Sequence, residues 1–213
     1  MKDSICYIVG AGENYGLNFV PLLGDYVIAA DGGLKYLEQS GIKANLVIGD
    51  FDTLHYKPNH PNVITLSEEK DDTDMLAAMR EGINKGYSVF HIYCGMGGRV
   101  EHTIANMQLL AYLSQHNRKG FLFGKDCIIT AVTNGSIEFS SDAKGRISVF
   151  SFSNISTGVY LKGLKYELDN ATLTTTFPIG VSNEFTGKES VVTVTDGTIL
   201  VVFSSELKED IKK

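Results

Sequence analysis

The sequence predicts an N-terminal α/β half with a mostly parallel sheet and helices on both faces, followed by a C-terminal all-β sandwich. Two different patterns of hydrophobic residues predict this division. Over the first half, continuous apolar runs alternate with helical patterns, which is typical of a parallel sheet covered on both faces. In the second half the apolar residues alternate with polar ones and no helical pattern appears between 126 and 204. We expect domains at 1–122 and 123–213 of the 213-residue chain.

In the first half, apolar runs predict the strands and 3.6-residue periodicity predicts the helices. The expected strands are 5–10, 26–31, 45–50, 62–67 and 88–95, and the expected helices are 32–41, 74–86 and 99–117. Asp72 or Thr73 can cap the second of these helices. Ligands of parallel sheets bind beyond the carboxyl ends of the strands, and Asp31, Asp50 and Gly95 lie at such ends.

In the second half, two-residue turn signals predict hairpins. Asn134-Gly135 and Asp196-Gly197 each lie in the middle of a long β-type stretch. We therefore expect a hairpin around each pair, with further strands at 146–152, 156–163 and 171–177. Such an arrangement is typical of a sandwich or a small barrel.

Composition excludes several classes of protein. The net charge is −6 and the pI about 5.4, so we expect no nucleic-acid partner. The sequence has no run of 18 apolar residues and no signal-peptide pattern at its start, so we expect no membrane span. Cys6, Cys94 and Cys127 fit no zinc or disulfide spacing. Buried thiols in a reducing cytoplasm are the expected state.

Carboxylates gather in two segments where strands end and helices begin. The segment "GDFDTL" holds Asp50 and Asp52, which point to the same side of an extended chain. The segment "KDDTD" holds Asp71, Asp72 and Asp74 just before a predicted helix. Turn and cap chemistry is one interpretation. A cation site is the other, because Mg²⁺ binds one or two carboxylates together with phosphate oxygens of a substrate.

A glycine-rich helix start offers a complementary anion site. In "YCGMGGRVEHTIAN", Gly97 and Gly98 allow close approach of the backbone, and the first turn of the helix favours an anion. Arg99, His102 and Asn106 share one helical face, and an Arg here can clamp a phosphate. Helical geometry directs Glu101 away from the Arg99 side. A glycine-rich turn with solvated polar residues is the simpler alternative.

Taken together, these segments resemble the thiamine pyrophosphokinases. The motifs "AADGGLKYL", "VIGDFDTL", "KDDTD", "GGRVEHTIAN", "GLKYEL" and "SNEF" occur in that order between residues 29 and 185. The resemblance implies a catalytic nucleotide-binding domain and a β-sandwich domain for thiamine binding and dimerisation. It implies a homodimer with active sites at the subunit interface. The implied reaction moves the pyrophosphate of ATP to the hydroxyl of thiamine, with Mg²⁺, and gives thiamine diphosphate and AMP.

The same resemblance assigns roles to individual positions. It implies that Mg²⁺ and phosphate are held by Asp50, Asp52, Asp71 and Asp74, with Asp31 and Gly32 in the same pocket. It implies a phosphate-facing helix start at Gly98, Arg99, His102 and Asn106, and a thiamine-side segment at Ser182 and Asn183. The family usually has Asp where this chain has Glu101. Trp is absent, so any aromatic stacking on thiamine must come from Tyr or Phe.

Two other enzyme classes share part of the pattern. The "DFDTL" segment is similar to the D-x-D-x-T strand end of haloacid-dehalogenase-like phosphatases, but Thr53 comes one place early. A metal-dependent D-x-D transferase leaves the glycine-arginine helix start unexplained. A thiamine- or nucleotide-binding module without catalysis needs no dense set of carboxylates. The sequence thus favours an ATP-dependent diphosphotransferase.

Overall fold

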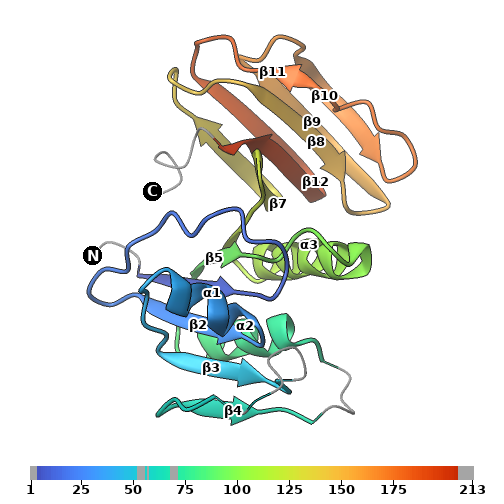
Figure 1. The fold of residues 1–213 in the computed structure, drawn as a ribbon. Coiled ribbons are helices and arrows are strands. Elements are labelled where there is room, and N and C mark those ends of the chain that lie inside the picture. Colours follow the sequence, from blue (N-terminus) through green and yellow to red (C-terminus); the bar gives the residue numbers. More distant parts are fainter. Residues whose placement is uncertain (1–3, 52–55, 57, 68–71, 206–213) are drawn as a thin grey trace. The chain divides into compact units, whose positions relative to one another are not determined.

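The structure is a computed structural model that describes residues 4–51, 56, 58–67 and 72–205. Two of the predicted site residues, Asp52 and Asp71, lie outside the described residues. The chain forms two compact units, coloured along the sequence in Figure 1. Unit 1 contains Met1–Leu109 and Arg118–Gly124, and unit 2 contains Leu110–Asn117 and Lys125–Lys213.

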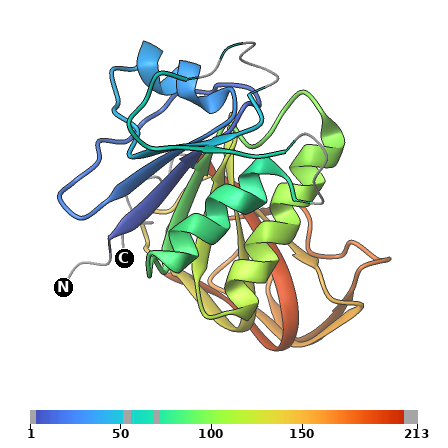
Figure 2. The same cartoon turned by 90° about the horizontal axis from the view of Figure 1, so that it is seen from below.

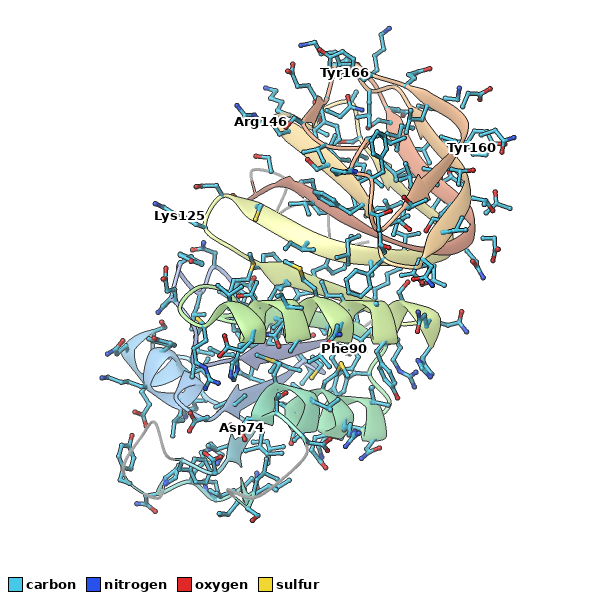
Figure 3. All side chains as sticks on the ribbon, turned by 90° about the vertical axis from the view of Figure 1, so that its right-hand side faces the viewer. Asp74, Phe90, Lys125, Arg146, Tyr160 and Tyr166 are labelled. Atoms are coloured by element: carbon cyan, nitrogen blue, oxygen red, sulfur yellow. The ribbon has the colours of Figure 1, made fainter. Side chains whose placement is uncertain are left out.

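Unit 1 is built on a parallel sheet, as predicted. Within the described residues its strands are β1 (Ile5–Val9), β2 (Tyr26–Ala30), β3 (Leu46–Gly49), β4 (Val63–Thr65), β5 (Val89–Tyr93) and β6 (Lys119–Phe123). They lie in the order β6-β5-β1-β2-β3-β4, and every neighbouring pair is parallel. Most apolar side chains of β1, β2, β3, β5 and β6 are buried, because helices or loops cover both faces. Val63 and Ile64 of β4, at the edge of the sheet, are half-buried. Phe90 of β5, labelled in Figure 3, is completely buried.

The helices of this fold are α1 (Gly33–Gln39), α2 (Asp74–Asn84) and α3 (Val100–Gln115). Figure 2 shows α1 on one face of the sheet, and α2 with the unit 1 part of α3 on the other. Thr73 caps α2, because its side-chain oxygen accepts the N–H of Leu76 at 3.1 Å. Of the two caps that the sequence allowed, the structure therefore selects the threonine.

The strand order reverses between β1 and β5. The chain runs outward from β1 through β2 and β3 to β4, then returns to β5 on the other side of β1. In open α/β sheets, the crevice at such a reversal point lies outside the carboxyl ends of the two strands and binds ligands. The strand β6 was not predicted, since "KGFLF" is too short a run to be distinguished from a loop by periodicity.

Unit 2 is β-rich, and no helix occurs between 126 and 204, all of which the structure describes. Its strands are β7 (Cys127–Phe139), β8 (Arg146–Ser151), β9 (Ile155–Lys162), β10 (Leu168–Thr174), β11 (Asn183–Glu184) and β12 (Ser190–Ser204). The first half of β12 pairs with β9, its second half pairs with β8, and β7 pairs with both halves. Phe139 and Phe203, from opposite halves of this long strand pair, meet at 5.1 Å between ring centroids.

The two predicted hairpins are wrong. Asn134-Gly135 lies inside β7 and Asp196-Gly197 inside β12, and the pairing of the two strands shifts register between Val194 and Thr198. Asn134 has φ 47° and Gly197 has φ 114°, and the Asn134 side chain accepts the Gly197 N–H at 2.8 Å. The turn residues thus supply left-handed backbone to a β-bulge that bends both strands, and the bulge separates the half of β12 that pairs with β9 from the half that pairs with β8.

Candidate functional site

The backbone at the reversal point is held by hydrogen bonds that continue beyond the ends of β1 and β5. The N–H groups of Gly10, Gly12 and Glu13 donate to the carbonyls of Tyr93, Cys94 and Met96, at 2.9, 2.8 and 2.9 Å. The loop after β1 therefore runs beside the glycine-rich loop after β5. This contact fixes the edge at which the sequence predicts a ligand.

Left-handed residues follow three strands of unit 1. Asp31 after β2 has φ 47°, Phe51 after β3 has φ 64°, and Cys94 after β5 has φ 52°. Gly97 and Gly98 follow with φ 81° and 62°. Non-glycine residues in this region are strained, and such strain gathers at ligand sites. Five left-handed residues at one sheet edge therefore support the predicted location of the site.

Asp31 carries an unsatisfied carboxylate oxygen. The residue is only 5% exposed, and within the described residues its Oδ1 has no hydrogen-bond partner. Its backbone N–H donates to the Ile48 carbonyl at 2.8 Å, which places it directly beside the end of β3. A buried carboxylate without a partner is unfavourable. A cation or a hydrogen-bond donor of a ligand would satisfy it.

Gly32 and Gly33 bring helix α1 against this edge. Gly32 is the residue before the first turn of α1. A Cβ built on Gly33 would lie 1.9 Å from the carbonyl oxygen of Val9, at the end of β1. The second glycine therefore permits a close approach of helix and strand that no other residue allows.

The "GDFDTL" segment differs from the expected extended chain. Phe51 is buried and left-handed, so the chain is not extended at this residue. Asp50 is partly buried at the end of β3. The position of Asp52 lies outside the described residues.

The "KDDTD" segment begins α2 at the same sheet edge, because β4 runs parallel to β3. Asp72 forms an ion pair with Arg80, and Asp74 is in the first turn of α2, where Figure 3 labels it. Carboxylate donors from this segment and from the ends of β2 and β3 suit Mg²⁺. Among the described residues, no three His, Cys, Asp or Glu side chains are grouped closely enough to hold a metal. Two of the predicted four ligands, Asp52 and Asp71, are not among those residues.

Arg99 precedes α3 and is 73% exposed at its side chain. Its carbonyl accepts the N–H of Thr103, so it takes the cap position of the helix. The expectation that Glu101 points away is wrong: the Arg99 Nε donates to Glu101 Oε1 at 2.6 Å. Helical spacing does not govern a residue that lies outside the helix. The hydrogen bond from Arg99 is the main cause that lowers the pKa of Glu101.

His102 and Asn106 are placed differently from one another. His102 is exposed on the first turn of α3, whereas Asn106 is 5% exposed. The amide nitrogen of Asn106 donates to the Gly95 carbonyl at 2.6 Å. Asn106 thus ties the helix to the glycine-rich loop, which shapes the loop without requiring contact with a ligand.

In unit 2, Asn183 organises the "GLKYEL" loop. Its Oδ1 accepts the N–H groups of Tyr166 and Glu184 at 3.0 and 2.9 Å, and its Nδ2 donates to the Tyr166 carbonyl at 2.6 Å. Tyr166 is 60% exposed and projects from unit 2 in Figure 3. Ser182, next to the buried Asn183, is exposed and left-handed with φ 61°. The asparagine therefore holds the backbone of the residue that carries the exposed Tyr166 ring.

Two residues of interest were not predicted from the sequence. Tyr166 lies within the "GLKYEL" motif, and the absence of Trp makes a Tyr in this motif a signal for aromatic stacking. Glu13 lies in "AGEN", which matches no phosphate-binding fingerprint. Only the structure shows its carboxylate against the Gly97-Gly98 turn, where Oε1 accepts the Gly98 N–H at 3.4 Å.

The fold and the site define a class: an α/β enzyme with a polar, anion-favouring edge at its strand reversal, joined to a β-rich domain. Comparison with known proteins gives the family. Residues 24–122 match the model "Thiamin pyrophosphokinase, catalytic domain", and residues 135–199 match "Thiamin pyrophosphokinase, vitamin B1 binding domain". The chain belongs to the thiamine pyrophosphokinase family, whose members are diphosphotransferase enzymes. The predicted family, fold class and enzyme class are confirmed, and the alternative phosphatase or D-x-D transferase is not favoured.

Individual relatives agree over nearly the whole chain. A thiamine pyrophosphokinase of Bacillus subtilis (strain 168) is 27% identical over 202 residues, which cover 89% of this chain and 94% of the relative. The crystal structure of the Bacillus subtilis enzyme superimposes with a TM-score of 0.82 at 25% identity, covering 94% of this chain and 99% of that one. Thiamin pyrophosphokinase from Candida albicans shares the fold at 16% identity, with a TM-score of 0.73 and coverage of 95% and 90%.

In the part of the chain that the structure describes, no helix combines the length and the apolar character needed to cross a membrane.

Proposed function

We propose that the protein transfers the pyrophosphate group of ATP to the hydroxyl of thiamine, giving thiamine diphosphate and AMP. The observation that supports this reaction is the edge of unit 1, where left-handed residues follow the ends of β2, β3 and β5 and the Gly97-Gly98 turn leads into α3. This edge combines carboxylates with an Arg and a helix N-terminus. Such a combination suits a metal-bound polyphosphate, because it provides donors for both the cation and the anion.

The phosphate groups and the metal have separate partners in this proposal. Mg²⁺ would be held by Asp50, Asp52, Asp71 and Asp74, with Asp31 and Gly32 beside them. When bound, the metal neutralises charge on the phosphate oxygens. Gly98, Arg99, His102 and Asn106 form the phosphate-facing helix start, although Asn106 acts there by holding the Gly95 carbonyl.

The chemistry follows from the positions of these groups. The thiamine oxygen forms a bond to the β-phosphorus of ATP, and the bond between that phosphorus and the bridging oxygen to the α-phosphate breaks, releasing AMP. An Asp of the cluster accepts the proton of the hydroxyl. Arg99 stabilises the charge that develops on the β-phosphate oxygens by donating hydrogen bonds to them. Positioning and electrostatics supply most of the rate, as in other phosphoryl transfers.

The thiamine side is proposed to lie on unit 2. Ser182 offers a hydroxyl there, Asn183 holds the loop, and Tyr166 offers an exposed ring that can stack on the pyrimidine or the thiazolium of thiamine. These three residues come from the loop before β10 and the segment around β11. We expect this surface to serve the active site of a homodimer.

Exposed apolar side chains support the dimer. Val20, Leu22 and Leu23 are exposed in the loop before β2, as are Phe177 and Ile179 in unit 2. A second copy of the chain would cover such residues. The three free cysteines support a reducing compartment, for which we propose the cytoplasm. Light scattering after size-exclusion chromatography tests the dimer, and a monomer at micromolar concentration contradicts it.

Product analysis tests the reaction. The protein is incubated with ATP, Mg²⁺ and thiamine, and the products are resolved by chromatography and ³¹P NMR. AMP and thiamine diphosphate in equal amounts are expected. ADP with thiamine monophosphate, or free phosphate alone, contradicts the proposal. A parallel incubation with EDTA tests the need for the metal, and undiminished turnover there removes Mg²⁺ from the account.

A further inference from the structure

Glu13 places a carboxylate on the glycine-rich loop at the strand reversal. It precedes residues 24–122, which match the catalytic family model, and the motifs do not include it. Its backbone N–H donates to the Met96 carbonyl at 2.9 Å. The main chain at Glu13 is therefore anchored to the loop after β5.

The side chain of Glu13 lies flat across Gly97. A Cβ built on Gly97 would approach the Cγ and Cδ of Glu13 to 2.7 Å. Its Oε1 accepts the N–H of Gly98 at 3.4 Å, and its Oε2 accepts the Tyr15 hydroxyl at 2.8 Å. The carboxylate is thus oriented by one bond from the loop and by one from its own segment.

This carboxylate lies at the turn to which the proposed function assigns a phosphate group. The two left-handed glycines and the start of α3 favour negative charge. In the structure, Glu13 supplies that charge from within the chain. Its side chain is exposed, so it can rotate into solvent while the backbone bond to Met96 persists.

We propose that Glu13 is an internal competitor for the nucleotide phosphate, occupying the Gly97-Gly98 turn until the phosphate displaces it. This inference rests on the proposed function, because it takes the phosphate to bind at that turn. Glu13 lowers the affinity for phosphate-bearing ligands and leaves the affinity for the nucleoside unchanged. It thereby acts as a specificity residue: a weakly charged anion gains too little at the turn to displace the carboxylate.

The alternative is that Glu13 only braces the loop. Bracing and competition predict opposite changes in phosphate affinity when the Glu13 side chain is removed. Without a brace the loop loses its shape and the phosphate binds more weakly. Without a competitor the phosphate binds more tightly. Glu13→Gln separates the two further, because the amide keeps the shape and an acceptor oxygen but removes the charge.

Isothermal titration calorimetry with ATP, inorganic pyrophosphate and adenosine, each in EDTA, tests the proposal. Glu13→Gln and Glu13→Ala are expected to bind ATP and pyrophosphate about threefold to fivefold more tightly, which is the size of a charge effect at a helix N-terminus. Adenosine should bind unchanged. Tyr15→Phe keeps every charge but releases one hold on the carboxylate, so it should shift affinity in the same direction by a smaller factor.

Glu38→Gln is the matched control, since Glu38 is an exposed glutamate on α1. Equal tightening in Glu38→Gln would show a general charge effect and overturn the proposal. Unchanged affinity in Glu13→Gln with weaker binding in Glu13→Ala would show bracing and also overturn it. The wild-type product assay is run beside these titrations. If the wild type makes thiamine diphosphate but the Glu13 variants do not bind phosphate more tightly, only the proposal for Glu13 is contradicted.

Discussion

Left-handed backbone appears in both units, but it is used differently in each. In unit 1, Asp31, Phe51 and Cys94 adopt it where strands end, and polar groups follow them at the sheet edge. In unit 2, Asn134 and Gly197 adopt it inside long strands, where they meet across a bulge. At these positions the same conformation therefore follows strand ends in unit 1 and lies within a bulge of a long strand pair in unit 2.

The neighbours of each left-handed residue explain the difference. Asn134 and Gly197 satisfy one another, since the asparagine side chain accepts the glycine N–H. The Oδ1 of Asp31 has no such partner within the described residues. We therefore expect a structural role for the left-handed residues whose polar neighbours are satisfied, and a ligand-binding role for those beside an unsatisfied polar atom. The comparison predicts loss of activity from changes in unit 1 and loss of stability from changes in the bulge of unit 2.

The largest expected effect comes from Arg99→Ala. Removing a donor to the developing charge should lower kcat/KM for thiamine diphosphate formation by about 100-fold to 1,000-fold. The side chain is exposed and pairs only with a neighbouring glutamate within the described residues, so the free energy of unfolding should change by less than about 1 kcal/mol. Steady-state kinetics and urea unfolding measure the two quantities. Lys35→Ala, another exposed cation near a helix start, should retain full activity.

Gly197→Ala, in the bulge of unit 2, should reduce stability and leave catalysis unchanged. At φ 114° an alanine is strained, and its Cβ would lie 2.8 Å from the Ser156 hydroxyl oxygen. We expect a loss of about 2 kcal/mol in the free energy of unfolding, with normal kcat for the folded fraction. Gly135→Ala, across the same bulge, has room for a Cβ and should change stability by less than about 0.5 kcal/mol. Equal effects of the two variants would contradict the assigned role of the bulge.

Asn183→Ala should affect both stability and substrate binding. It removes three hydrogen bonds that hold the Tyr166 and Glu184 backbone, which should cost about 2 kcal/mol of stability. Release of the loop should also raise the KM for thiamine more than the KM for ATP. Kinetics with each substrate varied in turn show this asymmetry. The exposed Asn154 provides the control variant Asn154→Ala, for which neither KM should move.

The free energy of unfolding should also depend on alkaline pH. Burial raises the pKa of Cys6 and of Cys94 from 9.0 to about 12, and burial followed by the charge of Asp25 raises the pKa of Tyr7 from 10.0 to about 12. A raised folded-state pKa contributes stability that is complete below the unfolded-state pKa and is lost as pH rises toward the folded value. All three groups belong to unit 1, so stability should decrease between pH 9 and 12.

Urea unfolding at several pH values in that window measures the slope. Cys6→Ala removes one of the titrating groups, so the free energy of unfolding should decrease less steeply with pH. Cys127→Ala is the comparison in unit 2, where burial and the nearby Asp126 also raise the thiol pKa. Cys127 is less buried than Cys6, and its removal should therefore alter the slope less. The reverse order would contradict the assignment of the alkaline sensitivity to unit 1.

Sequence patterns predicted five of the six strands that the structure describes in unit 1, because the apolar runs of β1, β2, β3 and β5 are largely buried. Thr73 likewise signalled the start of α2. The patterns also predicted the sheet edge that collects Asp31 and Asp50, since strand ends of a parallel sheet meet there. The sequence did not predict the structural role of the two turn pairs in unit 2. Asn-Gly and Asp-Gly encode a left-handed φ, and tertiary pairing decides whether that φ makes a hairpin or a bulge.

Contacts between distant segments were also beyond the sequence. The partners of Asn183 and Glu13 lie 17 and 85 residues away, and no periodicity relates such positions. Phe51 shows a related limit, because the alternation of the sequence predicted an extended chain at a residue that is left-handed and buried. A single sequence predicts which residues are buried at regular spacing. It does not predict which distant groups form hydrogen bonds, because those pairs depend on the folded structure.

The most direct test of the contrast between the units is Asp31→Asn, assayed for turnover and for urea unfolding without metal. The account predicts that kcat falls by at least about 100-fold, while the free energy of unfolding stays equal or rises, because a neutral amide is less costly to bury than an unsatisfied carboxylate. Wild-type turnover, or a clear loss of stability, would show that Asp31 is a structural residue and would contradict the functional reading of the unit 1 edge.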